Sequence, residues 1–348
     1  MTNSRLDRQQ ALDLFENCDL LELGEMAQAM RLRLHPQKRV TFAIDRNINY
    51  TNICECQCRF CAYYRRPEDA DAFVIDNVTL QQKIAETIDL GGTQILLQGG
   101  LHPDLKIDYY SKLLKTIKKD FPAIHIHGFS PPEISHIAAL SKLSLDETLQ
   151  QLKNAGLGSI PGGGAEILDD RVRTLISPNK IGWQRWLEVM ERAHNLNLRT
   201  TATMMFGSLE TPKELIEHLF RVREVQDRTG GFTAFIPWSF QPANTDLGPE
   251  VTQSATGVDY LRVLALSRLV LDNIDNLQAS WVTQGTKMAQ VALYFGANDF
   301  GSTMIEENVV AAAGVNFSIS LEELVDTIKE AGFKATQRDT LYNLIRDY

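Results

Sequence analysis

Segments with apolar residues at helical spacing alternate with short apolar runs along the chain, and this order predicts helices and strands in alternation. Residues 7–33 carry apolar side chains at helical spacing, including Leu12, Phe15 and Met30, so we expect one or two leading helices that end before Pro36. Segments with capping residues and helical spacing separate the later apolar runs. The expected strands lie at 40–44, 94–97, 124–129, near 159, 199–205, 232–237, 277–282 and 292–296.

A helix after each strand gives about eight βα units, which is typical of a parallel sheet. We therefore predict an α/β fold, a (β/α)8 TIM-type barrel with helical additions at both ends. The expected division is a helical extension over 1–36, the barrel over 37–315, and a C-terminal helical segment over 316–348 that packs on the barrel. Ligands of such a barrel lie at the carboxyl ends of the strands.

Composition narrows the class of protein. The 348 residues are 44% hydrophobic, which is enough for a large core. The net charge of −9 leaves no basic footprint, so we expect no nucleic-acid partner. The apolar runs are too short to span a bilayer, and the polar opening is unlike a signal peptide. We therefore expect no membrane partner and a cytoplasmic location.

Four of the five cysteines lie together after the first expected strand, unlike a secreted disulfide framework. Cys54, Cys58 and Cys61 have the spacing C-x3-C-x2-C, and three thiolates this close can hold three corners of a cubic iron–sulfur cluster. Such a cluster ordinarily uses four cysteines, so one iron stays open to a ligand. A structural zinc site is the alternative, but it needs a fourth ligand, and the only other cysteines are Cys18 and Cys56. We interpret Cys56 as a bystander that binds no metal.

The cysteine spacing, with Phe60 before the last cysteine, resembles the signature of the radical S-adenosylmethionine (radical SAM) enzymes. The resemblance implies a 4Fe-4S cluster in the loop 54–61 whose open iron binds SAM. An electron from the reduced cluster would cleave SAM to methionine and a 5′-deoxyadenosyl radical. An external electron donor such as flavodoxin or ferredoxin is also implied. Many members of this family have a partial barrel of six units, which is the alternative to eight.

Positions near the cysteines and at strand ends supply the expected cofactor contacts. Gln98, Gly99 and Gly100 follow the second strand and occupy the place of the glycine-rich motif that approaches SAM in this family. Glycines at such a place also make ordinary turns. We expect Phe60 and Tyr63, which flank Cys61, beside the cofactor as well.

A second glycine-rich segment, 161–166, follows the fourth strand and ends in Glu166. No lysine follows its glycines, so a phosphate loop is a poor interpretation. A carboxylate that accepts hydrogen bonds from ribose hydroxyls fits better and matches the family pattern. Arg171 and Arg173 follow closely and have the fork geometry to bind a carboxylate, although a surface role for one of them is equally plausible.

Longer segments narrow the resemblance to the enzymes of the menaquinone futalosine pathway and the deazaflavin-forming synthase subunits. Residues 45–50 and 130–133 are most similar to the dehypoxanthine futalosine cyclases. The similar segments are 44–54, 58–65, 98–105, 161–168 and 296–309.

This narrower resemblance implies a radical cyclisation of dehypoxanthine futalosine. The adenosyl radical would remove hydrogen from ribose C4′, the carbon radical would add to the benzoate ring, and loss of an electron and a proton would restore aromaticity. The candidate proton acceptors are His127, Glu133 and Asp299, which the sequence does not rank. Arg171 is a candidate anchor for the benzoate carboxylate. Aminofutalosine synthase, the deazaflavin synthase subunit and a zinc-stabilised binding protein are the alternatives.

Overall fold

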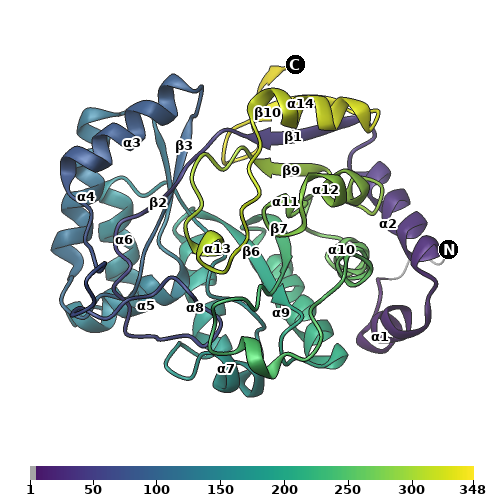
Figure 1. The fold of residues 1–348 in the computed structure, drawn as a ribbon, viewed down its shortest axis with the longest axis horizontal. Coiled ribbons are helices and arrows are strands. Elements are labelled where there is room, and N and C mark those ends of the chain that lie inside the picture. Colours follow the sequence, from purple (N-terminus) through teal and green to yellow (C-terminus); the bar gives the residue numbers. More distant parts are fainter. Residues whose placement is uncertain (1–4) are drawn as a thin grey trace.

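The computed structural model describes residues 5–348, which form an α/β barrel with helices around its wall (Figure 1). The helices are α1 (Arg8–Asn17), α2 (Leu20–Leu34), α3 (Asn77–Asp89), α4 (Ile107–Asp120), α5 (Pro131–Ser141), α6 (Leu145–Ala155), α7 (Asp170–Ile176), α8 (Trp183–Asn195), α9 (Pro212–Thr229), the 3₁₀ helix η1 (Gly248–Glu250), α10 (Gly257–Val270), α11 (Trp281–Gln284), α12 (Thr286–Ala292), α13 (Val309–Ala312) and α14 (Leu321–Glu330). The strands are β1 (Arg39–Ala43), β2 (Asn47–Asn49), β3 (Gln94–Gln98), β4 (His125–Gly128), β5 (Ser159–Ile160), β6 (Arg199–Phe206), β7 (Phe232–Ser239), β8 (Asn276–Leu277), β9 (Asp299–Ser302), β10 (Lys334–Arg338) and β11 (Leu344–Asp347).

Most of the barrel wall is a seven-stranded parallel sheet in the order β2-β3-β4-β5-β6-β7-β8. A second sheet has the order β11-β10-β1-β9. The two sheets meet where Gln278, just after β8, bridges Asp299 of β9 in parallel. On the other side β1 pairs with β9 and leads along the chain into β2. The predicted TIM-type α/β barrel is therefore confirmed.

The expected strands differ from the observed ones at the start and near the end of the barrel. The strand that leads into the cysteine loop is β2, because β1 belongs to the second sheet. The strand expected at 277–282 ends at Leu277, and the run expected as a strand at 292–296 instead holds the last residue of α12 and the turn that follows it. Phe295 in this run packs against α2, where a Cβ on Gly24 would lie 2.7 Å from the ring. A short apolar run has no periodicity that separates a strand from a buried helix end.

The C-terminal segment 316–348 is only partly helical, which corrects the expectation. After α14, strand β10 pairs in parallel with β1, and β11 pairs antiparallel with β10. The apolar pattern does not indicate β10 because several of its buried side chains are polar. Arg338, for example, is 5% exposed and bonds Asp299 inside the barrel. The division into an extension, a barrel and a C-terminal segment stays a prediction.

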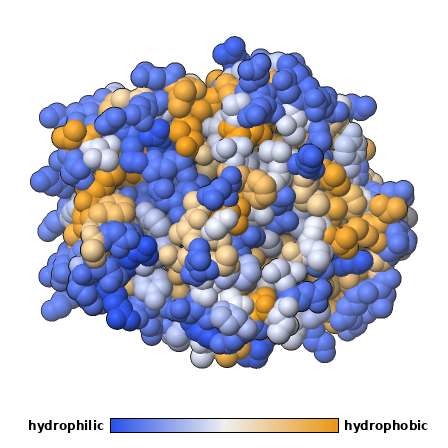
Figure 2. Space-filling view, viewed as in Figure 1, coloured by the Kyte–Doolittle hydropathy of each residue, from blue (hydrophilic) through white to orange (hydrophobic). Residues whose placement is uncertain are grey.

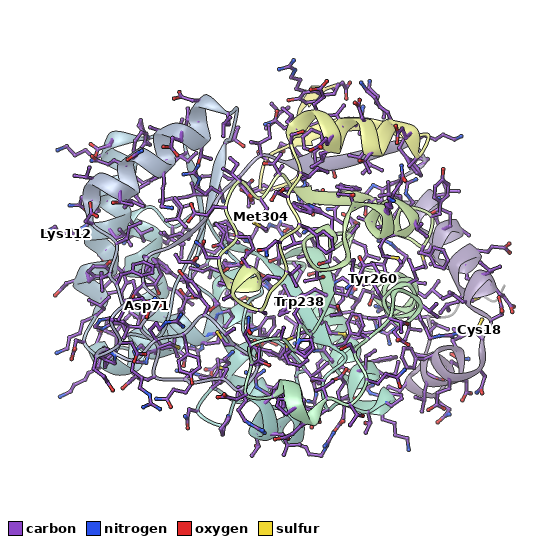
Figure 3. All side chains as sticks on the ribbon, in the orientation of Figure 1. Cys18, Asp71, Lys112, Trp238, Tyr260 and Met304 are labelled. Carbon is purple, nitrogen blue, oxygen red and sulfur yellow. The ribbon has the colours of Figure 1, made fainter. Side chains whose placement is uncertain are left out.

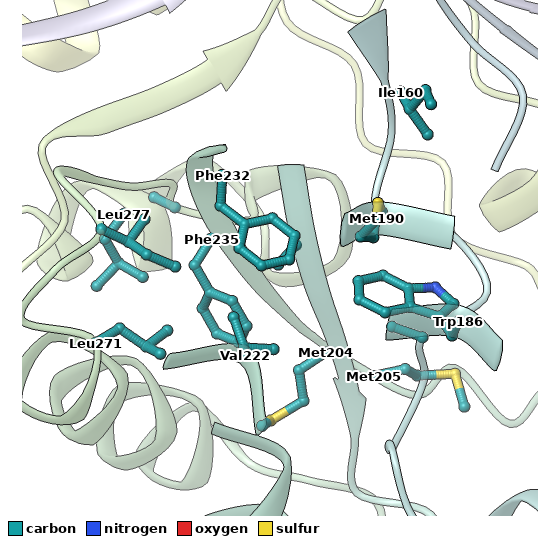
Figure 4. Packing of buried hydrophobic residues seen from close by; sticks show 14 of the residues in the cluster. Ile160, Trp186, Met190, Met204, Met205, Val222, Phe232, Phe235, Leu271 and Leu277 are labelled. Atoms are coloured by element: carbon teal, nitrogen blue, oxygen red, sulfur yellow. The ribbon is translucent and has the colours of Figure 1, made fainter. Parts of the chain in front are cut away.

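The core lies between the barrel wall and its helices (Figure 4). Trp186 of α8 stacks at 6.4 Å from Phe232 of β7, and both are buried. Met204 and Met205 at the end of β6 are fully buried, as expected for packing residues. This packing holds in place the strands that carry the polar side chains of the barrel interior.

The leading helices form as predicted. Helix α2 packs on α10 and α1 packs on α9, at the outer edge of the molecule. Figure 2 shows polar residues over most of the visible face, with apolar residues in separate patches. In the described residues, helices of sufficient length and apolar character to cross a membrane are absent.

Candidate functional site

The cysteine loop lies at the carboxyl end of β2 and is fastened by backbone hydrogen bonds. The amide of Cys54 donates to the carbonyl of Arg65 at 3.0 Å, and the amide of Arg59 donates to the carbonyl of Ile176 at 2.9 Å. All four loop cysteines line one pocket, which we call the cysteine pocket. It is lined by Asn49, Asn52, Cys54, Cys56, Cys58, Phe60, Cys61, Tyr63, Tyr64, Gln98, Gly99, Gly100, Leu101, Ser130, Pro132, Glu133, Gly163, Gly164, Lys180 and Val309.

The thiols of this pocket suit an iron–sulfur cluster. The neighbouring Cys56 thiol lowers the pKa of Cys54 to about 6 and also lowers the pKa of Cys58. Burial raises the pKa of Cys61, an effect that a bound metal offsets because it prefers the thiolate. The C-x3-C-x2-C cysteines therefore surround one pocket, and two of them favour the form that binds metal.

Gly99 and Gly100 allow the strand end to approach the cysteine loop. A Cβ on Gly100 would lie 2.1 Å from the carbonyl oxygen of Ile53, and one on Gly99 would lie 2.6 Å from the ring of Tyr50. The amide of Gly100 also donates to the carbonyl of Thr51 at 3.0 Å. A side chain at Gly100 would displace the backbone that carries Cys54, and one at Gly99 would displace the buried Tyr50 ring.

Glu133 of α5 lines the cysteine pocket, but its oxygens are occupied. It accepts hydrogen bonds from the Tyr50 hydroxyl at 2.8 Å, from the Gly99 amide at 3.0 Å, and from the amide and hydroxyl of Ser130. Burial raises its pKa to about 7. The geometry makes Glu133 a positioning residue that joins α5 to the loop after β3.

A second pocket, which we call the barrel pocket, opens inside the barrel and contains about 1550 Å³ of empty space including its mouth. Trp238 and Met304 belong to its lining and lie near the centre of the molecule in Figure 3. The loop after β9, with α13, also contributes to the lining and crosses the centre of the view in Figure 1. The residues that line both pockets are Phe60, Gln98, Gly163, Gly164 and Val309. The two pockets therefore adjoin, so ligands in them can meet.

Glu166 lines the barrel pocket from a strained position, with a positive φ of 40°. Its carboxylate lies 3.1 Å from Lys180 Nζ and 3.6 Å from an Arg173 guanidinium nitrogen. Its Oε2 is buried without a hydrogen-bond partner among the described residues. An acceptor of this kind fits a hydroxyl donor of a bound ligand. Lys180 also lies over the ring of Phe60 at 4.8 Å.

Lys180 has no signal in the sequence, although it lines the cysteine pocket. Burial alone would lower the pKa of its ammonium, but the neighbouring Cys58 and Glu166 raise it. The sequence gives no role to Asp45 either. It lines the barrel pocket, accepts from Gln94 Nε2 at 2.9 Å, and its pKa is raised by burial. Both residues lie in loops or strands that only the fold brings to the site.

The structure does not bring Asp299 and Arg171 to the pockets. Asp299 is fully buried and paired with Arg338 at 2.6 and 2.9 Å, and it also accepts from the Thr41 hydroxyl at 2.6 Å. Arg171 lies on the surface and pairs with Glu214. His127, in contrast, is 9% exposed and lines the barrel pocket from β4. Its Nδ1 contacts Ser159, and its Nε2 has no assigned partner in the described residues. Of the three candidate proton acceptors, His127 alone lines the barrel pocket.

Comparison with family models gives two matches that together cover most of the chain. Residues 48–222 match the radical SAM superfamily, and residues 229–347 match the CofH/MqnC C-terminal region. The first match contains the cysteine loop, and the second contains β7 to β11.

Individual proteins show the same likeness. The chain is 47% identical to cyclic dehypoxanthine futalosine synthase of Halalkalibacterium halodurans, over 100% of this chain and 94% of that protein. It is 42% identical to 5-amino-6-(D-ribitylamino)uracil–L-tyrosine 4-hydroxyphenyl transferase of Methanococcoides burtonii, over 97% and 96% of the two chains. Its fold is similar to that of the FeFe-hydrogenase maturase HydG from Carboxydothermus hydrogenoformans, with a TM-score of 0.73 at 17% identity, over 97% and 78% of the two chains.

Proposed function

The chain belongs to the radical SAM superfamily, and from this premise we propose that it is a radical cyclase that converts dehypoxanthine futalosine to its cyclic form in menaquinone biosynthesis. The observation that carries the proposal is the full-length similarity to a cyclic dehypoxanthine futalosine synthase. Two adjoining pockets support it, because the reaction needs SAM and a large substrate next to each other. Enzymes of this superfamily use a 4Fe-4S cluster and SAM, and these are the cofactors of this chain.

The cysteine pocket is where we place these cofactors. Cys54, Cys58 and Cys61 would hold the cluster, and the SAM contacts would come from Phe60, Tyr63, Gln98, Gly99, Gly100 and Glu166. When bound, these cofactors supply a 5′-deoxyadenosyl radical that takes a hydrogen atom from the substrate. The free Oε2 of Glu166 suits a ribose hydroxyl, and Lys180 holds that carboxylate in place.

The barrel pocket is where we place dehypoxanthine futalosine. Its ribose would face the cysteine pocket at the shared lining residues, with the benzoate ring deeper in the barrel. Trp238 offers an aromatic face in the lining, and the loop with α13 contributes to the same lining. This enclosure holds the ribose carbon against the ring and keeps competing hydrogen donors away, which is a contribution of positioning.

The second candidate function is that of the archaeal relatives, which join tyrosine-derived and ribitylaminouracil units. Their similarity, 42% over nearly the whole chain, favours it enough to test. The family match no longer leaves room for the zinc-stabilised binding protein, because that match is to a superfamily of enzymes.

Electron supply and location follow from the same proposal. We expect a small one-electron carrier such as flavodoxin or ferredoxin as the donor. The thiolates that would hold the cluster need a reducing compartment, so we expect the cytoplasm.

Separate incubations with each candidate substrate test the assignment. The reconstituted, reduced protein is incubated without oxygen with SAM and one candidate substrate. The candidates are dehypoxanthine futalosine, the enolpyruvyl benzoate that aminofutalosine synthase uses, and tyrosine with 5-amino-6-(D-ribitylamino)uracil. We expect a product two hydrogens lighter than dehypoxanthine futalosine, together with 5′-deoxyadenosine. Product from either other mixture, with none from dehypoxanthine futalosine, contradicts the proposal.

A further inference from the structure

Two histidines and a serine form a hydrogen-bonded chain across strands β4 and β5. His127 Nδ1 lies 2.6 Å from Ser159 Oγ, and His125 Nε2 lies 2.7 Å from the same oxygen. The two histidines share one face of β4 because side chains alternate along a strand. Ser159 is the direct neighbour of His127 in the strand register. The sheet therefore fixes all three groups in line.

This hydrogen-bonded row of side chains leads out of the barrel pocket. His127 lines that pocket, Ser159 is 1% exposed, and His125 is partly exposed at the start of β4. Gly158 makes room for the outer ring, since a Cβ there would lie 2.6 Å from His125. The inner end thus meets the pocket contents, and the outer end meets solvent.

We propose that His127 accepts the proton that the substrate ring loses after cyclisation and that Ser159 and His125 carry it outward. This inference rests on the proposed function. In the step, a ring C–H bond breaks and its proton passes to His127 Nε2. The Nδ1 proton of His127 moves to Ser159, and the serine proton moves to His125 Nε2. The unpaired electron left on the ring goes to a one-electron acceptor of the iron–sulfur class, which restores aromaticity.

The other two candidate proton acceptors, Glu133 and Asp299, are poorly placed for this step. Glu133 accepts four hydrogen bonds, and Asp299 lies outside both pocket linings and is paired with Arg338. Burial lowers the pKa of His127 to about 3, so its imidazole is free to accept a proton at neutral pH but does not retain it. A base of this kind needs an onward acceptor, and Ser159 supplies the path to one.

The experiment uses dehypoxanthine futalosine with deuterium on the ring carbon that forms the new bond. For Ser159→Ala and His127→Gln we expect the ratio of cyclised product to 5′-deoxyadenosine to fall at least on the order of tenfold. A ring-deuterium isotope effect on product formation should appear in Ser159→Ala, and Ser159→Thr, which keeps a hydroxyl on the strand, should restore the ratio. Ratios do not depend on how much of the sample folds.

His194→Gln is the matched control. His194 is also buried and lies 2.7 Å from each of two hydroxyl oxygens, those of Thr200 and Thr229, but it lies outside both pocket linings. We expect it to leave the product ratio unchanged. An unchanged ratio in Ser159→Ala and His127→Gln, or an equal loss in the control, overturns the inference while the cyclase assignment stands. Absence of cyclised product from the wild-type protein instead refutes the proposed function.

Discussion

Glu133→Gln should change how stability depends on pH. The pKa of Glu133 rises from 4.5 to about 7 because the carboxyl is buried. A folded pKa above the unfolded one means that the folded protein binds the extra proton. This contribution to stability is complete below the unfolded pKa and is lost as pH rises through the folded pKa. Between pH 5 and pH 8 the linkage relation gives a loss of about 2 to 3 kcal/mol.

Glutamine keeps the shape of the neutral acid but does not titrate, so the variant lacks this loss. Urea unfolding of the cluster-free wild-type and variant proteins at pH 5 and pH 8 measures the difference. The free energy of unfolding of the wild type, relative to Glu133→Gln, should fall by about 2 to 3 kcal/mol between the two pH values. Other titrating groups are common to both proteins and cancel.

A second capping box supplies the control. Ser144 and Glu147 at the start of α6 repeat the arrangement of Ser130 and Glu133, but Glu147 is exposed and its hydrogen bonds with Ser144 lower its pKa. Glu147→Gln should therefore show the same difference from wild type at pH 5 and pH 8. If Glu133→Gln also shows a constant difference, the desolvation of Glu133 in this account is refuted.

Three further predictions concern the site and the barrel. Alanine at each cysteine of the C-x3-C-x2-C motif should lower iron and sulfide content on reconstitution, whereas Cys56→Ala should retain the cluster; equal loss in all four would contradict the motif assignment. Gly100→Ala should reduce cluster incorporation, because its Cβ would lie 2.1 Å from the Ile53 carbonyl oxygen, and normal incorporation would show that the loop tolerates the shift. Arg338→Met leaves Asp299 buried without its partner and should cost about 3 to 5 kcal/mol in urea unfolding, so a loss below about 1 kcal/mol would argue against the buried pair.

The sequence predicts the fold where apolar runs and caps agree. Strands β3 to β7 appear at the expected positions because most of their buried side chains are apolar and turn residues bound them. Strand β10 was missed because buried Arg338 is matched by Asp299, 39 residues away, and no local pattern records such a partner. A strand whose buried side chains are polar is therefore recognised only in the folded structure.

The candidate site divides in the same way. The cysteine spacing and the Gly99-Gly100 pair are local, and the structure places them in one pocket. Long-range geometry decides the rest. It joins Glu133 to Tyr50 and Gly99, which shows a positioning role, and it brings Lys180 beside Glu166. It also singles out His127 among three acids and bases that the sequence leaves equal.

In the proposed reaction a SAM-derived radical removes hydrogen from ribose C4′ of dehypoxanthine futalosine. The most direct measurement uses substrate with deuterium at C4′, incubated without oxygen with the reduced, cluster-loaded protein and SAM. We predict one deuterium in the 5′-deoxyadenosine and a cyclised product that has lost it. Deuterium retained in the product, or 5′-deoxyadenosine without label, would contradict the account.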